Sequence, residues 1–240
     1  MRASAPRDFL TDRPFAHRGL HKGGVPENSL AAVRDAIAAG YGVECDVRLS
    51  RDGIAYVFHD RRTDRLTGRR GRFAGLAADM RQALRLMGSE EAVPSLSALL
   101  ALTGTQTPLL IELKSDDGPH GCARLCAAVA RDLSAHRGAL AAVMSFDPLM
   151  CHWFARHRPD VARGLVIGRR HRTGITARRD LALAIARAMP HFIACDVRDL
   201  PKARAIPRRR RLPLLCWTVR SARDRLRAHD ADQIIFEMAS

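Results

Sequence analysis

The sequence predicts an α/β fold of the (β/α)8 TIM-like barrel class, with a β-hairpin arm added after the second strand. Short β-like runs alternate with helical stretches along most of its 240 residues. Without the arm there are eight such runs, near residues 15, 44, 111, 143, 165, 193, 216 and 235, and seven are followed by helical segments. Eight parallel strands with intervening helices define this barrel, and its usual length of roughly 250 residues fits one domain over residues 1–240.

Cap residues mark the first helix of the predicted barrel. The brief strand at 15–17 runs into a glycine-rich loop, after which Asn28 or Ser29 can cap the helix. Apolar residues then recur at helical spacing down to Gly40, a residue type that favours a helix C-terminus. These signals place a helix before the second strand at 42–49.

The turn after the second strand is too short for a parallel crossover. Residues 50–53 read Ser-Arg-Asp-Gly, a tight-turn sequence, and the apolar run 54–58 follows at once. A parallel neighbour needs a crossover of a dozen or more residues, so this run is predicted to be an antiparallel arm. It brings His59 back toward the end of the sheet that carries His17.

The remaining elements continue the alternation. We predict strands at 108–114, 141–146, 162–167, 191–196, 213–219 and 233–236, helices at 76–86, 95–102, 122–135, 148–157, 177–188 and 221–228, and a short helix or loop at 202–206.

The composition indicates a cytoplasmic protein with anionic partners. Lys and Arg together outnumber Asp and Glu by 40 − 25 = 15, and a charge of +15 favours phosphorylated small molecules, nucleic acid or an anionic membrane surface as partners. An arginine-rich genome composition is the alternative explanation of this charge. The sequence shows no signal-peptide pattern and no run approaching the roughly 20 apolar residues of a membrane span. The six cysteines form no C-x-x-C pair, and we expect them to be reduced.

Two carboxylates stand two residues apart in the second strand. Because successive strand side chains alternate between faces, Glu44 and Asp46 share one face of the sheet. Adjacent carboxylates resist burial unless positive charge lies between them, and hard oxygen ligands suit Mg²⁺ or Ca²⁺. The alternative is a solvated edge strand with two acids of no function.

Polar residues at the strand ends are predicted to converge on the carboxyl end of the barrel, where such barrels hold their active sites. They are His17, Arg18, Glu44, Asp46, His59, Glu112, Lys114, Ser145, Asp196, Trp217 and Glu237. For Asp196, a rim residue and a helix cap both stay open. Ser145 is a substrate contact or, more often for a strand-end hydroxyl, a cap.

This set predicts phosphoryl chemistry. Glu44, Asp46 and Glu112 can supply three oxygens to one divalent metal ion, which would neutralise the phosphate. Arg18 and Lys114 add fixed positive charge.

The two histidines can divide the proton transfers near neutral pH. One of His17 and His59 would deprotonate the nucleophile, and the other would protonate the leaving alkoxide. That division suits a phosphodiester, whose alkoxide leaving group needs a proton.

Ten short motifs follow one another in order along the chain. They are His17-Arg18-Gly19, Pro26-Glu27-Asn28-Ser29, Glu44-x-Asp46-Val47, Asp52-Gly53, Val57-Phe58-His59-Asp60, Asp64-Arg65-Leu66-Thr67-Gly68, Pro94-Ser95-Leu96, Ile111-Glu112-Leu113-Lys114, Ser145-Phe146 and Trp217-Thr218-Val219. Together they resemble the glycerophosphodiester phosphodiesterase family, which is related in fold to phosphatidylinositol-specific phospholipase C.

The resemblance implies a metal-dependent hydrolase of lipid and glycerol metabolism that cuts glycerophosphodiesters into glycerol 3-phosphate and an alcohol. It implies the following roles: Mg²⁺ or Ca²⁺ ligands at Glu44, Asp46 and Glu112, an acid/base pair at His17 and His59, phosphate contacts at Arg18 and Lys114, and an aromatic wall on the glycerol side at Trp217. We expect Glu27 and Asn28 to combine helix capping with hydrogen bonds to the substrate. The chain departs from the family in its last motif, where Gln233-Ile-Ile-Phe-Glu237 replaces the usual Gly-Ile-Ile-Thr-Asp.

Two other functions stay open. A basic rim could bring the protein to anionic lipid, where it would act on lysolipids as a phospholipase D. A barrel that only binds phosphodiesters or nucleic acid through its arginine-rich segments (61–72, 169–179 and 204–211) is the non-enzymatic alternative. Aromatic residues make up only 5% of the chain, and no stacking pattern for nucleic acid is present.

Overall fold

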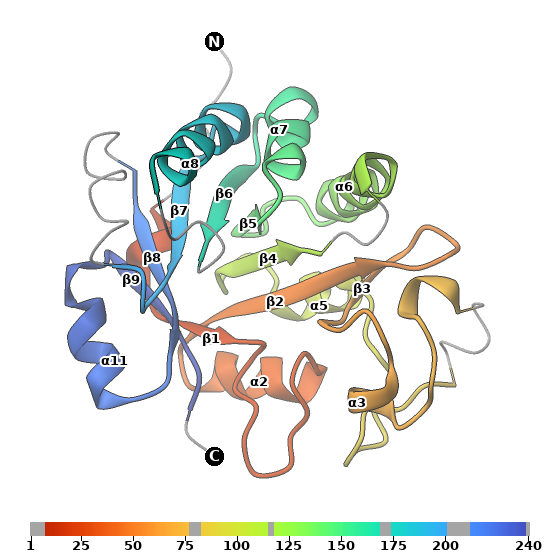
Figure 1. Ribbon diagram of the computed structural model, residues 1–240. Coiled ribbons are helices and arrows are strands. Elements are labelled where there is room, and N and C mark those ends of the chain that lie inside the picture. Colours follow the sequence, from red (N-terminus) through yellow and green to blue (C-terminus); the bar gives the residue numbers. More distant parts are fainter. Residues whose placement is uncertain (1–7, 77–82, 115–117, 169–173, 201–211, 239–240) are drawn as a thin grey trace.

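A closed barrel of eight parallel strands forms the centre of the computed structural model, which describes residues 8–76, 83–114, 118–168, 174–200 and 212–238 (Figure 1). The strands follow one another around the barrel in chain order, and the last pairs with the first. They are β1 (Phe15–His17), β2 (Gly42–Leu49), β4 (Leu109–Leu113), β5 (Ala141–Ser145), β6 (Ala162–Ile167), β7 (Phe192–Asp196), β8 (Leu214–Val219) and β9 (Gln233–Phe236). This arrangement confirms the predicted (β/α)8 fold.

Helices surround the barrel (Figure 1). They are α1 (Phe9–Asp12), α2 (Leu30–Ala38), α3 (Asp64–Thr67), α5 (Leu96–Thr103), α6 (Gly118–Ala135), α7 (Pro148–His157), α8 (Gly174–Ala188) and α11 (Ala222–Arg227), with 3-10 turns η1 (Phe73–Gly75) and η3 (Ala228–Asp230). Ser29 caps α2 by accepting from the amide of Ala32 at 3.0 Å. Asn28 is therefore left free to turn its side chain elsewhere.

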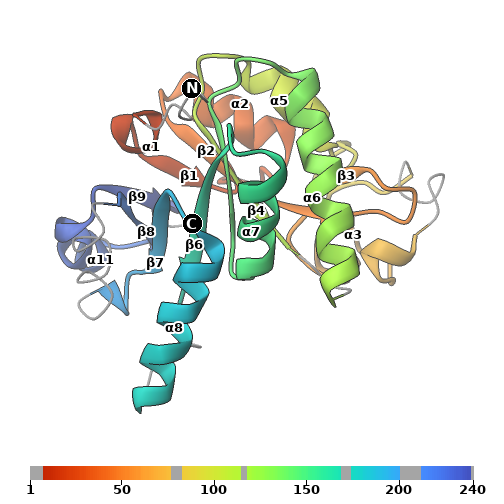
Figure 2. The same ribbon diagram turned by 90° about the horizontal axis from the view of Figure 1, so that it is seen from above.

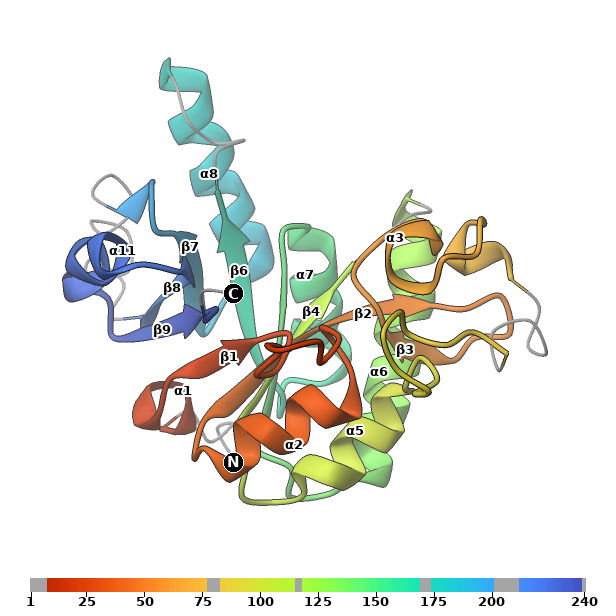
Figure 3. The ribbon, with the colours of Figure 1, turned by 90° about the horizontal axis from the view of Figure 1, so that it is seen from below.

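The predicted arm is present as β3 (Ala55–Val57), which pairs antiparallel with the end of β2. The Phe58 amide donates to the carbonyl of Asp46 at 2.8 Å, and the Arg48 Nε donates to the carbonyl of His59 at 2.8 Å. The ring of Phe58 stacks on Phe73 with centroids 4.7 Å apart. These contacts fix the backbone at His59 beside the barrel mouth. Figures 2 and 3 show the arm and α3 on one side of the barrel, opposite α11.

Alternation along the strands divides the buried side chains into two layers. In β2, Val43, Cys45 and Val47 pack outward against the helices, whereas Glu44 and Asp46 point into the barrel. Toward the amino ends of the strands, an apolar cluster fills the barrel interior, and α1 contributes to it. The cluster consists of Phe9, Leu10, Phe15, Leu110, Ala142, Met144, Ala162, Val166, Phe192, Ala194, Leu215 and Ile235. The carboxylates Glu44 and Asp46 thus lie above an apolar layer inside the barrel.

Some predicted elements differ from those of the structure or lie outside its described residues. The predicted helix at 76–86 falls largely on residues 77–82, outside the described part, and is wrong for 83–86, where Arg85 bridges to Ala92. Leu84 and Leu86 both enter the cluster around Phe58, as alternate residues of an extended segment do. The predicted segment 202–206 and the basic residues 169–173 and 204–211 also lie outside the described residues.

All six cysteines are buried, and none forms a disulfide. Among the described residues, no helix combines the length and apolarity needed to span a membrane.

Candidate active site

Strand register brings the three predicted metal ligands together at the carboxyl end of the barrel, the end that holds its mouth. Glu44 lies opposite His17 on β1, and Asp46 lies opposite Glu112 on β4. All three carboxylates are buried, and one oxygen from each lies within 4.8 Å of the others. We call these three residues the acidic cluster.

The acidic cluster suits a divalent cation. Burial and the neighbouring charges of Asp46 and Glu112 raise the pKa of Glu44 well above its ordinary value. Its Oε1 is buried and has no hydrogen-bonding partner among the described residues. Three hard oxygens with excess negative charge are the donor set that Mg²⁺ or Ca²⁺ prefers, and a bound cation would relieve the repulsion. The residues present therefore fit the predicted ion.

Two cations face the acidic cluster. Lys114 Nζ lies 2.6 Å from Glu112 Oε1 and 3.1 Å from Asp46 Oδ1. Arg18 Nε lies 3.1 Å from Asp46 Oδ2. Burial alone would raise the pKa of Asp46, but Lys114 and Arg18 outweigh it and lower that pKa. Fixed positive charge thus lies directly beside the acidic cluster.

Glu27 and Asn28 lie behind these groups. Arg18 Nη1 donates to Glu27 Oε1 at 2.8 Å, and Asn28 Nδ2 donates to Asp46 Oδ2 at 3.1 Å. Arg18 and Asn28 both have a positive backbone φ, at 59° and 58°, which is uncommon for residues other than glycine. Such strain often marks functional sites, and here it aims both side chains at Asp46.

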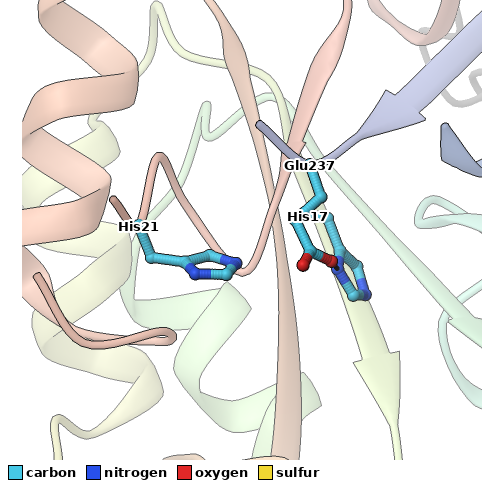
Figure 4. Close-up of side chains that lie close together, drawn as sticks. All are labelled: His17, His21 and Glu237. Atoms are coloured by element: carbon cyan, nitrogen blue, oxygen red, sulfur yellow. Dashed lines mark hydrogen bonds and ion pairs between the residues drawn. The ribbon is translucent and has the colours of Figure 1, made fainter. Parts of the chain in front are cut away.

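His17 presents its two ring nitrogens to different partners. Nδ1 lies 3.0 Å from Glu237 Oε2, and Nε2 lies 3.9 Å from Glu44 Oε2 (Figure 4 draws His17 with Glu237 and His21). Glu237 also accepts from Arg220 Nη2 at 2.7 Å, and its pKa is lowered to about 2, chiefly by the bond from His17. Burial lowers the pKa of His17, while the bond to Glu237 acts in the opposite direction.

His59 repeats this arrangement on the other side of the mouth. Its Nδ1 lies 2.7 Å from Asp60 Oδ1, and Arg65 Nε holds Asp60 Oδ2 at 2.6 Å. Burial also lowers the pKa of His59. When each Nδ1 donates to its carboxylate, each Nε2 keeps a free lone pair, which is the tautomer a proton acceptor needs.

A cavity of about 310 Å³ connects these groups. It is lined by His17, Arg18, Glu44, His59, Glu112, Lys114, Met144, Phe146, Val166, Trp217, Thr218, Arg220 and Ile235. One wall is aromatic, with Phe146 and Trp217 packed edge to face at 5.5 Å between centroids. The site is thus charged on one side and apolar on the other.

A family model described as the Glycerophosphoryl diester phosphodiesterase family matches residues 17–237, from the first histidine to the terminal acid. The chain belongs to this family.

Curated relatives match short segments. A glycerophosphodiester phosphodiesterase of Bacillus altitudinis is 45% identical over 58 residues, covering 24% of this chain and 23% of that protein. A probable glycerophosphodiester phosphodiesterase 2 of Mycobacterium tuberculosis is 38% identical over 88 residues, covering 36% and 33%. The matched segments thus span about a third or less of these relatives.

Solved structures match over nearly the whole chain. A phosphodiesterase from Oleispira antarctica, in complex with the product sn-glycerol-3-phosphate, has a TM-score of 0.79 at 22% identity and covers 95% of this chain and 94% of that chain. A protein from Silicibacter pomeroyi described as a putative glycerophosphoryl diester phosphodiesterase has a TM-score of 0.80 at 25% identity, covering 98% and 91%. The barrel is the fold these proteins share.

The other strand-end residues of this family member have structural partners. Ser145 Oγ donates to the carbonyl of Leu113 at 2.9 Å and accepts from the Asp147 amide at 3.1 Å, so it links the end of β4 to the start of α7. Asp196 accepts from the amide of Arg198 at 2.9 Å and also lines a second cavity of about 440 Å³ that adjoins the first. Asp196 thus both caps a turn and faces the rim.

The carboxylates that hold the histidines were not predicted in that role. Asp60 follows His59 directly, and a neighbouring acid is a weak signal because adjacent side chains often diverge. Glu237 was named only as a strand-end residue, since its partner lies 220 positions earlier. Long-range pairing of this kind follows from barrel closure, which sequence spacing alone does not specify.

Proposed function

We propose that this protein hydrolyses glycerophosphodiesters to glycerol 3-phosphate and an alcohol. The observation that carries the proposal is a buried acidic cluster flanked by two histidines, each held at Nδ1 by a carboxylate. Family membership supports the reaction class, and the Oleispira relative was solved with the same product. One divalent cation, Mg²⁺ or Ca²⁺, would be bound by Glu44, Asp46 and Glu112.

The charged side chains orient the phosphate in this proposal. When bound, the cation supplies positive charge that offsets the developing negative charge on the phosphoryl oxygens. Lys114 and Arg18 bind the remaining oxygens, and Glu27 holds Arg18 in place through its 2.8 Å bond. Asn28 fixes the orientation of Asp46. Glu27 and Asn28 thus act on the substrate through their neighbours.

The histidine pair carries the protons. The Nε2 of one histidine removes the proton of the nucleophile, which is water or the neighbouring glycerol hydroxyl, and the other donates a proton to the leaving alkoxide. Glu237 and Asp60 keep each ring in its orientation through Nδ1. Trp217 provides the apolar wall against which the glycerol carbons pack.

Other parts of the proposal concern the whole chain. We infer that residues 1–240 work as one domain, that the protein acts in the cytoplasm on small metabolites of lipid and glycerol metabolism, and that weak contact with anionic membranes accompanies its charge of +15. The oligomeric state is left open.

A lysolipid substrate is the second candidate. Phe146 is 39% exposed at the rim beside Trp217, where an acyl chain could pack. This reaction uses the same acidic cluster and histidines. A barrel that binds phosphodiesters or nucleic acid without cutting them would have no need of the two carboxylate-held histidines.

A substrate panel tests the proposal. Purified protein with Mg²⁺ or Ca²⁺ is expected to release glycerol 3-phosphate from glycerophosphocholine and glycerophosphoethanolamine, with choline and glycerol phosphate measured separately. Faster cleavage of lysophosphatidylcholine than of glycerophosphocholine would favour the lysolipid reaction. Binding of these compounds without turnover, under any metal, would refute the hydrolase.

The Glu237→Gln variant is expected to move the His17 limb of the kcat/KM pH profile to lower pH. Burial lowers the pKa of His17, and the hydrogen bond and charge of Glu237 partly oppose that effect. Removing the charge leaves burial less opposed, so the pKa of His17 falls further and its limb moves the same way, whether His17 acts as acid or base. An unmoved limb in Glu237→Gln, compared with the exposed control Glu90→Gln, would contradict this role, and Glu237→Asp is expected to restore part of the profile.

A further inference from the structure

A second group of metal-ligating side chains lies on the Nδ1 side of His17. His17, His21 and Glu237 each offer one ligand atom, and these atoms all lie within 4.8 Å of one another. Figure 4 shows the ring of His21 directed toward Glu237 and His17. His17 also borders the acidic cluster, which it faces through its other ring nitrogen, Nε2.

One ring nitrogen of His21, Nε2, makes no hydrogen bond within the described residues, and it is buried. A buried polar atom without a partner costs free energy, so such atoms usually bind something. The hydrolytic mechanism does not use His21.

The loop that carries His21 is held firmly. The Leu20 amide donates to the carbonyl of Ala32 on α2 at 2.8 Å. Gly19, at φ 79°, packs so closely that a Cβ there would lie 2.8 Å from Ala32. The backbone next to His21 is therefore fixed against α2, at a position from which the ring can reach Glu237.

The donor set favours a transition metal. Two imidazoles and one carboxylate suit Zn²⁺ or Co²⁺, whereas Mg²⁺ and Ca²⁺ prefer oxygen ligands alone. The 3.0 Å between His17 Nδ1 and Glu237 Oε2 needs little change to reach the separation of two zinc ligands. Bonds of about 2.1 Å at tetrahedral angles place two such ligands about 3.4 Å apart.

We propose that His17, His21 and Glu237 bind one Zn²⁺-type ion, separate from the cation of the acidic cluster, and that this ion inhibits the enzyme. The inhibition rests on the proposed function, because it requires His17 to transfer protons, whereas the binding does not. The metal takes the Nδ1 lone pair of neutral His17, and the single ring proton moves to Nε2. Nε2 then has no lone pair with which to accept a proton, and with the metal on Nδ1 the ring cannot take the second proton of the imidazolium that a proton donor needs.

Arg220 competes with the metal for Glu237. Its guanidinium lies 2.7 Å from Glu237 Oε2, but its side chain is 55% exposed and can turn into solvent. The positive charge of Arg220 also opposes a cation at this place. Removing it should therefore strengthen metal binding.

Cobalt absorption tests the binding directly. With Mg²⁺ in excess, we expect about one equivalent of Co²⁺ to produce a visible absorption band typical of low-coordinate, nitrogen-ligated cobalt. The band should be lost in His21→Gln and Glu237→Gln, appear at lower Co²⁺ in Arg220→Gln, and persist in the control His229→Gln. Circular dichroism checks that each variant is folded. A band that survives unchanged in folded His21→Gln, or no band in the wild type, would overturn the site.

Rate measurements test the inhibition separately. Each variant is compared with its own rate at constant Mg²⁺ while Zn²⁺ is added. We expect the half-inhibiting Zn²⁺ concentration to rise at least tenfold in His21→Gln and to fall in Arg220→Gln. A cobalt band together with undiminished turnover would overturn the inhibition, whereas no turnover in any condition would refute the proposed function and leave the metal site standing.

Discussion

Replacing His17 or His59 with glutamine is expected to lower kcat by about 10³-fold, within the range typical of lost general acid or base catalysis. Burial lowers the pKa of both rings, which favours their neutral form, so glutamine removes little charge. Folding should therefore change little, which thermal melting can check. The control is His229→Gln, in η3 at the far end of the barrel.

An activated substrate would separate the roles of the two histidines. A leaving group such as nitrophenolate departs without a proton, so it should restore the rate of the variant that lacks the acid and leave the variant that lacks the base slow. Near wild-type hydrolysis of glycerophosphocholine by either variant would refute its place in the reaction.

Removing the divalent cation is expected to abolish turnover and to lower the melting temperature. EDTA should silence the protein, and Mg²⁺ or Ca²⁺ should restore it. At an ion concentration 100 times Kd, binding to the folded state adds about 2.7 kcal/mol, which corresponds to roughly 5–10 °C for a chain of this size.

The Glu44→Gln variant should lose both the metal-dependent turnover and the metal-induced rise in melting temperature. Its metal-free form should melt no lower than the wild type, because the pKa of Glu44 is raised by burial and by two neighbouring carboxylates, and an amide removes that repulsion. Glu90→Gln, an exposed change on the same chain, is the matched control. Full activity in EDTA, or an unchanged metal-induced shift in Glu44→Gln, would contradict the assignment of the acidic cluster.

The local rules of strand geometry predicted much of this site. Alternation along β2 put Glu44 and Asp46 on one face, and the short turn at 50–53 required the antiparallel arm that carries His59. Both inferences depend on neighbours in sequence, where backbone geometry leaves few choices.

Partners that are distant in sequence could not be predicted in the same way. The contact between His17 and Glu237 exists only because β9 pairs with β1, and side-chain directions there depend on the whole barrel. The choice of Ser29 over Asn28 as the cap of α2 likewise depended on Asp46, which draws the Asn28 amide into the mouth. The error at 83–86 arose because two leucines at alternate positions pack in a cluster that forms around Phe58.

The pairing of β1 with β9 also bears on how the protein is made. Because Glu237 follows His17 by 220 residues, a nascent chain holds the histidine long before the carboxylate that contacts its ring. Until β9 docks against β1, the ring of His17 lacks its carboxylate partner. The proposed acid/base pair is therefore complete only when the barrel has closed, so on the proposed function partly synthesised chains should not hydrolyse phosphodiesters.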